Sequence, residues 1–193
     1  MRCIGFAAIK NRARCAIALT ILALVSSGGA AESLAFNGPD GFGGVRWGAT
    51  EEQLNEKFDF LNCFNYAPGY EYLGERSCSG RAWMLGDLYL EPSYSFRRDQ
   101  LVSVGFSFKS SEFERVTGVF VELYGLPTTD SIEPFKSPKG IESTNRTLKW
   151  LGPVIAIRLT RYNRDIPRGF AIIQTRAELE ESEEIWRRIY GRQ

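Results

Sequence analysis

The sequence contains no histidine. Histidine is the side chain that most often moves protons near neutral pH, so its absence excludes Ser-His-Asp and Cys-His triads and most zinc sites. No serine is followed by lysine three positions later, which also removes the Ser-x-x-Lys nucleophile. A pair of carboxylates remains as a route to hydrolysis, but the sequence pairs no two acids. We therefore expect no enzymatic activity, with a carboxylate-based hydrolase as the alternative.

Long apolar runs are scarce as well. The mainly apolar run Cys15–Val25 has eleven residues, fewer than the roughly 20 that a membrane-spanning helix needs. Small residues follow at 26–31, and four basic residues precede the run: Arg2, Lys10, Arg12 and Arg14. This order is typical of a secretory signal peptide. We predict a cleaved signal at 1–31, one domain over 32–193, no transmembrane segment after cleavage, and a periplasmic or secreted location.

An excess of positive charge is also absent. Residues 1–31 hold four of the 24 Lys and Arg residues and none of the 23 Asp and Glu residues, so the chain without them has a net charge of −3. Nucleic-acid binding relies on clustered Lys and Arg, so we expect no nucleic-acid partner. The 162 residues that follow the signal are enough for one buried core without extra cross-links.

Cysteine is rare, and only Cys63 and Cys78 remain once Cys3 and Cys15 leave with the signal peptide. An even pair in an exported chain is typical of a disulfide. The spacing is not Cys-x-x-Cys, and the missing histidines argue against a metal site. We predict a structural disulfide and neither a metal ion nor another cofactor.

Three pairs of residues match the capping box that begins a helix: Thr50 with Gln53, Ser111 with Glu114, and Thr175 with Glu178. They predict one helix to about residue 58, a second that ends before Gly125, and a helix at the C-terminus. Apolar spacing gives the last helix an inner stripe of Leu179, Ser182, Trp186 and Ile189.

Between these helices the apolar residues recur every second position, as in half-buried strands. The clearest strand carries Val102, Val104, Phe106 and Phe108, and the polar turn at 97–100 pairs it with residues 94–96. Further strands are predicted around Leu148 and Trp150, Ile155 to Leu159, and Phe170, Ile172 and Gln174. We therefore predict an α+β fold. It consists of tandem repeats, about 42–108 and 111–190, each a helix followed by a three-stranded antiparallel meander. The repeats form one sheet layer packed by helices, closed by the C-terminal helix.

One segment carries a family resemblance. Phe42, Gly44, Trp47, Gly48 and Thr50 form the pattern F-x-G-x-x-W-G-x-[ST] before a helix, which resembles a segment of small exported bacterial proteins of unknown function. The helix-then-meander plan is similar to the folds of the β-lactamase inhibitor protein and of small lipoproteins of outer-membrane assembly. Those proteins bind other proteins, so the resemblance implies a binding domain and no catalytic residues.

The segment best suited to binding lies inside and just after the predicted disulfide loop. It is rich in Gly, Ser and Asn, and it holds the residues that we predict to bind: Tyr66, Tyr70, Tyr72, Arg81 and Trp83. Tyr, Trp and Arg are common anchors of interfaces, although each of these side chains could instead cover the core.

We expect a non-catalytic binding module whose partner is another protein of the cell envelope. It would be an accessory factor, or an inhibitor or immunity protein of a hydrolase. The same aromatic side chains could stack on sugar rings, so a carbohydrate- or small-ligand-binding domain is a further alternative.

Overall fold

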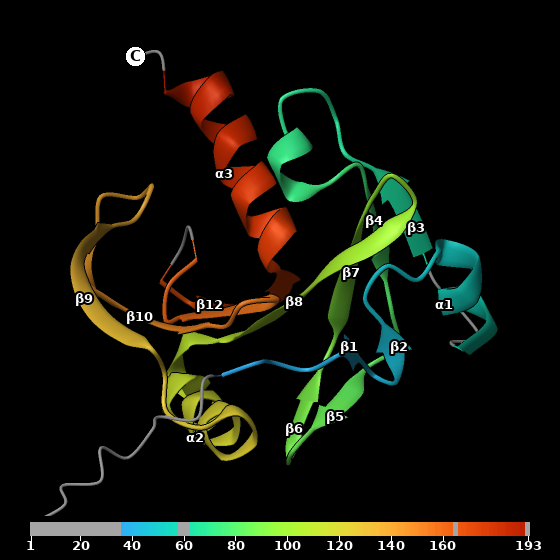
Figure 1. The fold of residues 1–193 in the computed structure, drawn as a ribbon. Coiled ribbons are helices and arrows are strands. Elements are labelled where there is room, and N and C mark those ends of the chain that lie inside the picture. The colour runs from blue at the N-terminus through green and yellow to red at the C-terminus, as the bar shows by residue number, and fades with distance from the viewer. Residues whose placement is uncertain (1–35, 58–61, 164–165, 192–193) are drawn as a thin grey trace, which may run out of the picture. The chain divides into compact units, whose positions relative to one another are not determined.

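The computed structural model describes residues 36–57, 62–163 and 166–191. The predicted signal peptide at 1–31 lies outside this part, and so do the side chains of Trp83 and Leu85. The described residues combine antiparallel strands with three α-helices: α1 (Glu51–Lys57), α2 (Phe113–Tyr124) and α3 (Arg176–Tyr190) (Figure 1). The predicted α+β class is confirmed, and no described helix is long and apolar enough to span a bilayer.

The main sheet of the described residues has eight antiparallel strands in the order β3-β4-β7-β8-β12-β11-β10-β9. In that order they are β3 (Asn62–Asn65), β4 (Arg76–Ser79), β7 (Pro92–Arg97), β8 (Gln100–Lys109), β12 (Arg168–Thr175), β11 (Ile155–Thr160), β10 (Glu142–Leu151) and β9 (Thr129–Lys136). The first four follow α1 along the chain and the other four follow α2, so each half supplies four strands instead of the expected three.

The strands that the sequence did not predict include both edges, β3 and β9. Neither edge strand has a buried residue in its pattern, so neither shows the apolar alternation of a half-buried strand.

Two short hairpins and two 3₁₀ turns complete the described part. The hairpins pair β1 (Gly41–Phe42) with β2 (Val45–Arg46), and β5 (Trp83–Leu85) with β6 (Leu88–Leu90). The 3₁₀ turns are η1 (Glu71–Leu73) and η2 (Ser110–Glu112).

The apolar core lies on one face of the main sheet, between the sheet and the elements α1, α2 and the β1–β2 hairpin. Leu54 of α1 is fully buried, and Phe120 of α2 packs against Trp150 with ring centroids 5.9 Å apart. Phe42 of β1 contacts the rings of Tyr94 and Phe106 at 6.4 and 5.1 Å. Burial of these aromatic side chains is the main driving force for this packing.

Two strands differ in detail from the predicted alternation. A bulge between Ser95 and Phe96 places Leu101 opposite Phe96, so Leu101 is buried and Val102 only half-buried. In β12 the core side chains are Ala171 and Ile173, whereas the predicted set of Phe170, Ile172 and Gln174 lies on the opposite face. Both faces of β12 are covered, so its sequence has no clean alternation.

Of the three predicted capping boxes, the one at Thr50 forms both of its hydrogen bonds and the one at Thr175 forms the side-chain cap. The Thr50 amide donates to Gln53 Oε1 at 3.0 Å, and the Gln53 amide donates to Thr50 Oγ1 at 3.3 Å. Thr175 caps α3 by accepting from the Glu178 amide at 3.1 Å. The Ser111 box was wrong: residues 110–112 form η2, α2 begins at Phe113, and the Glu114 carboxylate pairs with Arg146.

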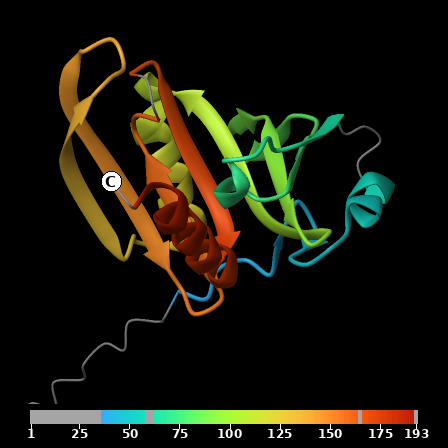
Figure 2. The ribbon, with the colours of Figure 1, turned by 90° about the horizontal axis from the view of Figure 1, so that it is seen from above.

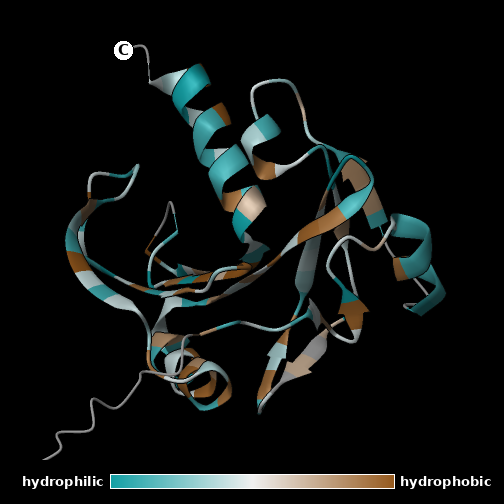
Figure 3. Cartoon of the chain, in the orientation of Figure 1, coloured by the Kyte–Doolittle hydropathy of each residue, from teal (hydrophilic) through white to brown (hydrophobic). Residues whose placement is uncertain are grey.

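Helix α3 packs on the other face of the sheet, opposite the core (Figure 2). Its predicted inner stripe was wrong, since the buried residues are Glu178 and Ile185 whereas Trp186 is half-exposed. Figure 3 shows most of the helix as hydrophilic. The helix is therefore held by a buried polar contact as well as by a narrow apolar one, and hydrophobic periodicity does not detect the polar contact.

Candidate functional site

The predicted disulfide closes the loop that was expected to bind. Cys63 and Cys78 are direct partners across β3 and β4, with an S–S bond of 2.02 Å and their Cα atoms 4.0 Å apart. The segment between them carries η1 and several tyrosines. The cross-link thus fixes the base of this loop on the edge of the sheet.

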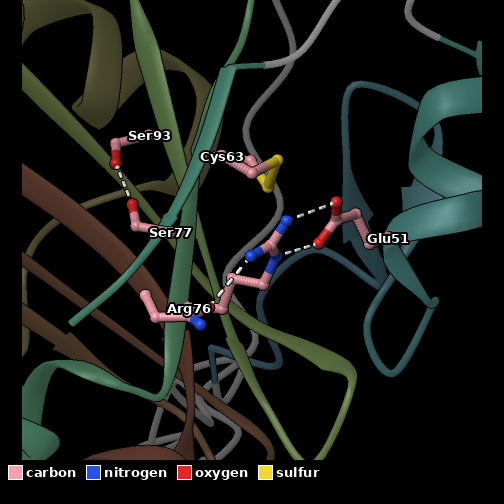
Figure 4. Close-up of a disulfide and its surroundings, with 7 residues drawn as sticks. Glu51, Cys63, Arg76, Ser77 and Ser93 are labelled. Atoms are coloured by element: carbon pink, nitrogen blue, oxygen red, sulfur yellow. Dashed lines mark hydrogen bonds and ion pairs between the residues drawn. A yellow bond between two sulfur atoms is a disulfide. The ribbon is translucent and has the colours of Figure 1, made fainter.

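An ion pair beside the disulfide connects the loop base to α1 (Figure 4). Arg76 donates from Nε and Nη2 to the two carboxylate oxygens of Glu51, and from Nη1 to Asn65 Oδ1 at 2.9 Å. The hydrogen bonds from Arg76 lower the pKa of the Glu51 carboxyl, against a smaller opposing effect of burial.

Glu51 also approaches both cysteines, with one carboxylate oxygen and the two sulfur atoms within 4.8 Å of one another. By distance alone, these three described residues could hold a metal ion. However, the two sulfur atoms are bonded to each other and the carboxylate is bound to Arg76. The arrangement is that of a structural cross-link, since a metal ligand needs a free thiolate.

The tip of the loop is folded into η1 and carries Tyr70 and Tyr72. The Gly69 amide donates to Glu71 Oε2 at 2.8 Å, and this backbone hydrogen bond lowers the pKa of Glu71. Gly74 has a φ of +116° and lies against the backbone oxygen of Phe96, where a Cβ atom would be 3.0 Å away. A glycine is needed here because the loop turns back onto β7 at close range.

One buried ion pair anchors α3 to the loop and to the sheet. Arg97 of β7 and Glu178 of α3 are only 5% and 4% exposed, and they join through Nε–Oε2 at 2.7 Å and Nη2–Oε1 at 2.9 Å. Arg97 Nη2 also donates to the Glu71 backbone oxygen at 3.0 Å, and Ser182 Oγ donates to Glu178 Oε1 at 2.8 Å. The hydrogen bonds to Glu178 raise the pKa of Arg97, which remains charged.

Four aromatic rings meet where η1 and α3 lie side by side. We call Tyr70, Tyr72, Trp186 and Tyr190 the aromatic cluster. Ring centroids are 6.3 Å apart for Tyr70 and Tyr72, 6.0 Å for Tyr72 and Tyr190, and 5.6 Å for Trp186 and Tyr190. The Tyr190 hydroxyl donates to the Gly69 backbone oxygen at 3.1 Å. Three of the rings remain substantially exposed: Tyr70 at 45%, Trp186 at 49% and Tyr190 at 39%.

The structure divides the predicted binding residues between two places. Tyr70 and Tyr72 belong to the aromatic cluster, while Tyr66 is half-buried and contacts the ring of Phe64 at 5.5 Å. Arg81 is exposed beyond the other end of β4, and Trp83 lies in β5 with its side chain outside the described part.

Two members of the aromatic cluster, Trp186 and Tyr190, were not among the predicted binding residues. The helical spacing placed Trp186 on an inner stripe, and no local pattern indicates that α3 brings it to the tyrosines.

Two acidic side chains of the described part share one arginine. Asp87 and Glu112 both face the guanidinium of Arg115, at 2.9 and 3.8 Å. A glycosidase needs two carboxyl groups that flank a common space, one of them protonated. Two carboxylates that share an arginine form a surface ion-pair network instead.

Comparisons with known proteins identified no relative of this chain. No protein-family model, curated protein or solved structure matches this chain. The geometry of its surface is therefore the basis for inferring its function.

Proposed function

We propose that this chain is an exported, non-catalytic protein-binding module of the cell envelope, and that it binds its partner through the aromatic cluster. The observation that carries the proposal is the continuous contact of four rings across two elements, three of them open to solvent. Tyrosine and tryptophan dominate the energetics of protein interfaces because they offer large, rigid and amphipathic surfaces.

The support beneath the cluster favours binding at low entropic cost. The disulfide fixes the loop at its base, and the Arg97–Glu178 pair fixes α3 against η1. A surface that is ordered before binding loses less conformational freedom when the partner arrives. The disulfide on the loop side and the ion pair on the α3 side therefore hold the exposed rings in place before a partner binds.

We propose that the partner is either an envelope protein that this chain assists or a hydrolase that it inhibits. The strand order is symmetric about the β8–β12 pair, and each half of the sheet follows a helix. This arrangement supports the tandem-repeat plan expected from the sequence. The likeness to inhibitory and assembly proteins rests on the sequence pattern and names no particular partner, so the partner must be found by experiment.

A carbohydrate partner is the alternative, because the exposed rings of Trp186 and Tyr70 could stack on sugars. Titration with soluble peptidoglycan fragments distinguishes the two, with tryptophan fluorescence as the readout. We expect the tryptophan fluorescence to stay unchanged when these peptidoglycan fragments are added. A saturable shift that Tyr70→Ala abolishes, with the Trp186 reporter still present, would replace the protein partner with a carbohydrate.

The main test is capture of envelope proteins on the immobilised mature protein. We compare it with the double variant Tyr70→Ala/Trp186→Ala and with Ile132→Ala, which changes an exposed side chain of β9 outside the cluster. We expect a specific partner to be retained at least 10-fold less by the double variant and equally by Ile132→Ala. Equal retention of every captured protein by all three would reject the cluster as the binding surface.

A further inference from the structure

A second surface lies between β6 and the end of β8 and shares no residue with the aromatic cluster. It is an open cleft of about 620 Å³. Buried apolar side chains lie at its base, namely Leu88, Leu90, Phe108 and Val116. Charged side chains line its rim, namely Asp87, Lys109, Glu112, Arg115 and Arg168. An apolar floor with a charged rim is suited to a ligand that has side chains of both kinds.

The cleft exists because one strand leaves the sheet. Pairing of β7 with β8 extends only to Pro92, which stands opposite Phe106. The residues before Pro92 turn away at Glu91 and pair with β5 as β6 (Figure 1). Proline has no amide hydrogen to donate to a neighbouring strand, so it is a common place for pairing to stop.

The last part of β8 is consequently an open edge. Ser107–Lys109 pair with β12 on one side, where Lys109 stands opposite Arg168. On the other side no strand of the described residues pairs with them, and the cleft occupies that position. An unpaired strand edge is a template for a further strand, which is how many proteins bind extended peptides.

The charge of the cleft is unbalanced at this edge. Lys109 and Arg168 are direct cross-strand partners of like charge, and neither makes an ion pair with a described residue. The acids of the rim compensate them only in part: Asp87 and Glu112 both contact Arg115, and the five charged side chains of the rim leave a net charge of +1. Like charges directly opposite each other are destabilising, so an acidic guest would relieve the repulsion.

We propose that this cleft binds an extended acidic peptide segment of a partner protein, which adds a strand along Ser107–Lys109. Its backbone pairs with the open edge, its carboxylates lie at Lys109 and Arg168, and its alternate side chains lie on the apolar floor. A small free anion would use the two cations only and would leave the floor and the edge unused. The observations therefore favour a peptide.

The test selects random heptapeptides displayed on phage against the full mature protein and against the variant Lys109→Glu/Arg168→Glu. We expect peptides enriched in Asp and Glu at alternate positions for the wild type, and peptides enriched in Lys and Arg for the variant. Both residues are exposed, so the variant should keep its fold, which far-UV circular dichroism checks. Selection without an acidic preference would overturn the proposal.

Affinity measurements on one selected peptide test the site and the strand separately. Fluorescence anisotropy should show at least 10-fold weaker binding to Lys109→Glu/Arg168→Glu and unchanged binding to Lys149→Glu. Lys149 is a matched control because it stands opposite another cation, Arg158, and lies outside the cleft. If both variants weakened peptide binding equally, the peptide would not bind at this cleft.

N-methylation of the same peptide tests the added strand. Methyl groups on alternate amides should abolish binding in one register and preserve it in the other, because only every second amide faces β8. If N-methylation in neither register weakened binding, the peptide would not add a strand to β8. The variant Tyr70→Ala/Trp186→Ala should bind the peptide normally, so failure of this proposal and failure of the aromatic cluster are distinguishable.

Discussion

Arg97 and Glu178 lie 81 positions apart in the chain, and they form a bidentate ion pair that is almost fully buried. Such a pair adds little net stability over apolar residues of similar volume, but the loss of one partner leaves an uncompensated buried charge. Here the pair decides where α3 lies, because the same guanidinium also holds the backbone of η1. The position of the aromatic cluster thus depends on it.

We predict that Glu178→Gln lowers the free energy of unfolding by about 3 kcal/mol, because the buried Arg97 charge loses its bidentate partner and keeps only the more distant Glu181 carboxylate, 3.8 Å from Nη1. Urea unfolding followed by circular dichroism measures the change. The control is Glu180→Gln, whose carboxylate pairs with Arg176 at the surface and should cost less than about 1 kcal/mol. Equal effects of the two substitutions would contradict the role given to the buried pair.

Because of the Glu51–Arg76 ion pair, we predict that the free energy of unfolding depends on pH in the acidic range. Because the folded protein lowers the pKa of Glu51 below its ordinary value of 4.5, the pair stabilises fully above that value. Its contribution disappears as the pH falls through the lower folded pKa. The pair is partly exposed, so the contribution at pH 7 is about 0.5–1 kcal/mol.

The matching measurement compares the wild type with Glu51→Gln in urea at several pH values. We expect the wild type to be more stable at pH 7 and the difference to vanish near pH 2. A difference that is constant over this range would show that Arg76 does not act through the charge of Glu51.

Among the elements, those with a strong local signal were predicted well. The two-residue turn between β7 and β8 has Arg98 and Asp99 at φ of 52° and 58°, which matches the twist of a tight hairpin. Local hydrogen bonds cap α1, and alternation defines β8. The edge strands were missed because they bury little, and the stripe of α3 was wrong because one of the two buried residues of that helix is a carboxylate, Glu178.

The disulfide acts at the level of the β3–β4 pair. We predict that Cys63→Ser/Cys78→Ser lowers the free energy of unfolding by about 3 kcal/mol, as expected for a closed loop of 15 residues. The fold should persist, since the apolar core lies mainly beneath the central strands and the helices. Thermal unfolding with and without a reductant measures the effect, and an unchanged midpoint would contradict it.

In the whole described unit, the two halves of the sheet share one core. The β8–β12 pair joins them at the centre, and Phe106 stands opposite Ala171 across that boundary. Phe120 of α2 covers Trp150 in the second half, while Gly86 of the first half lies against Val119 of the same helix. We therefore expect the two halves to fold together as one unit, and neither half to fold by itself.

We predict that residues 34–109 alone show no cooperative unfolding, because β8 loses its neighbour β12 and the cover of α2. Urea titration of this fragment by circular dichroism tests the point, and addition of the fragment 110–193 should restore a transition. A cooperative transition in the first fragment by itself would mean that the halves are independent.

The sequence alone determined the class of this protein: helices from the capping boxes at Thr50 and Thr175, central strands from alternation, a disulfide from Cys63 and Cys78, and no histidine chemistry. These features depend on near neighbours or on composition. Only the tertiary structure decided which tyrosines meet Trp186 and Tyr190, and where β8 is left with an open edge. Both depend on contacts between segments far apart in the chain, such as Arg97 with Glu178, and no local pattern encodes such contacts.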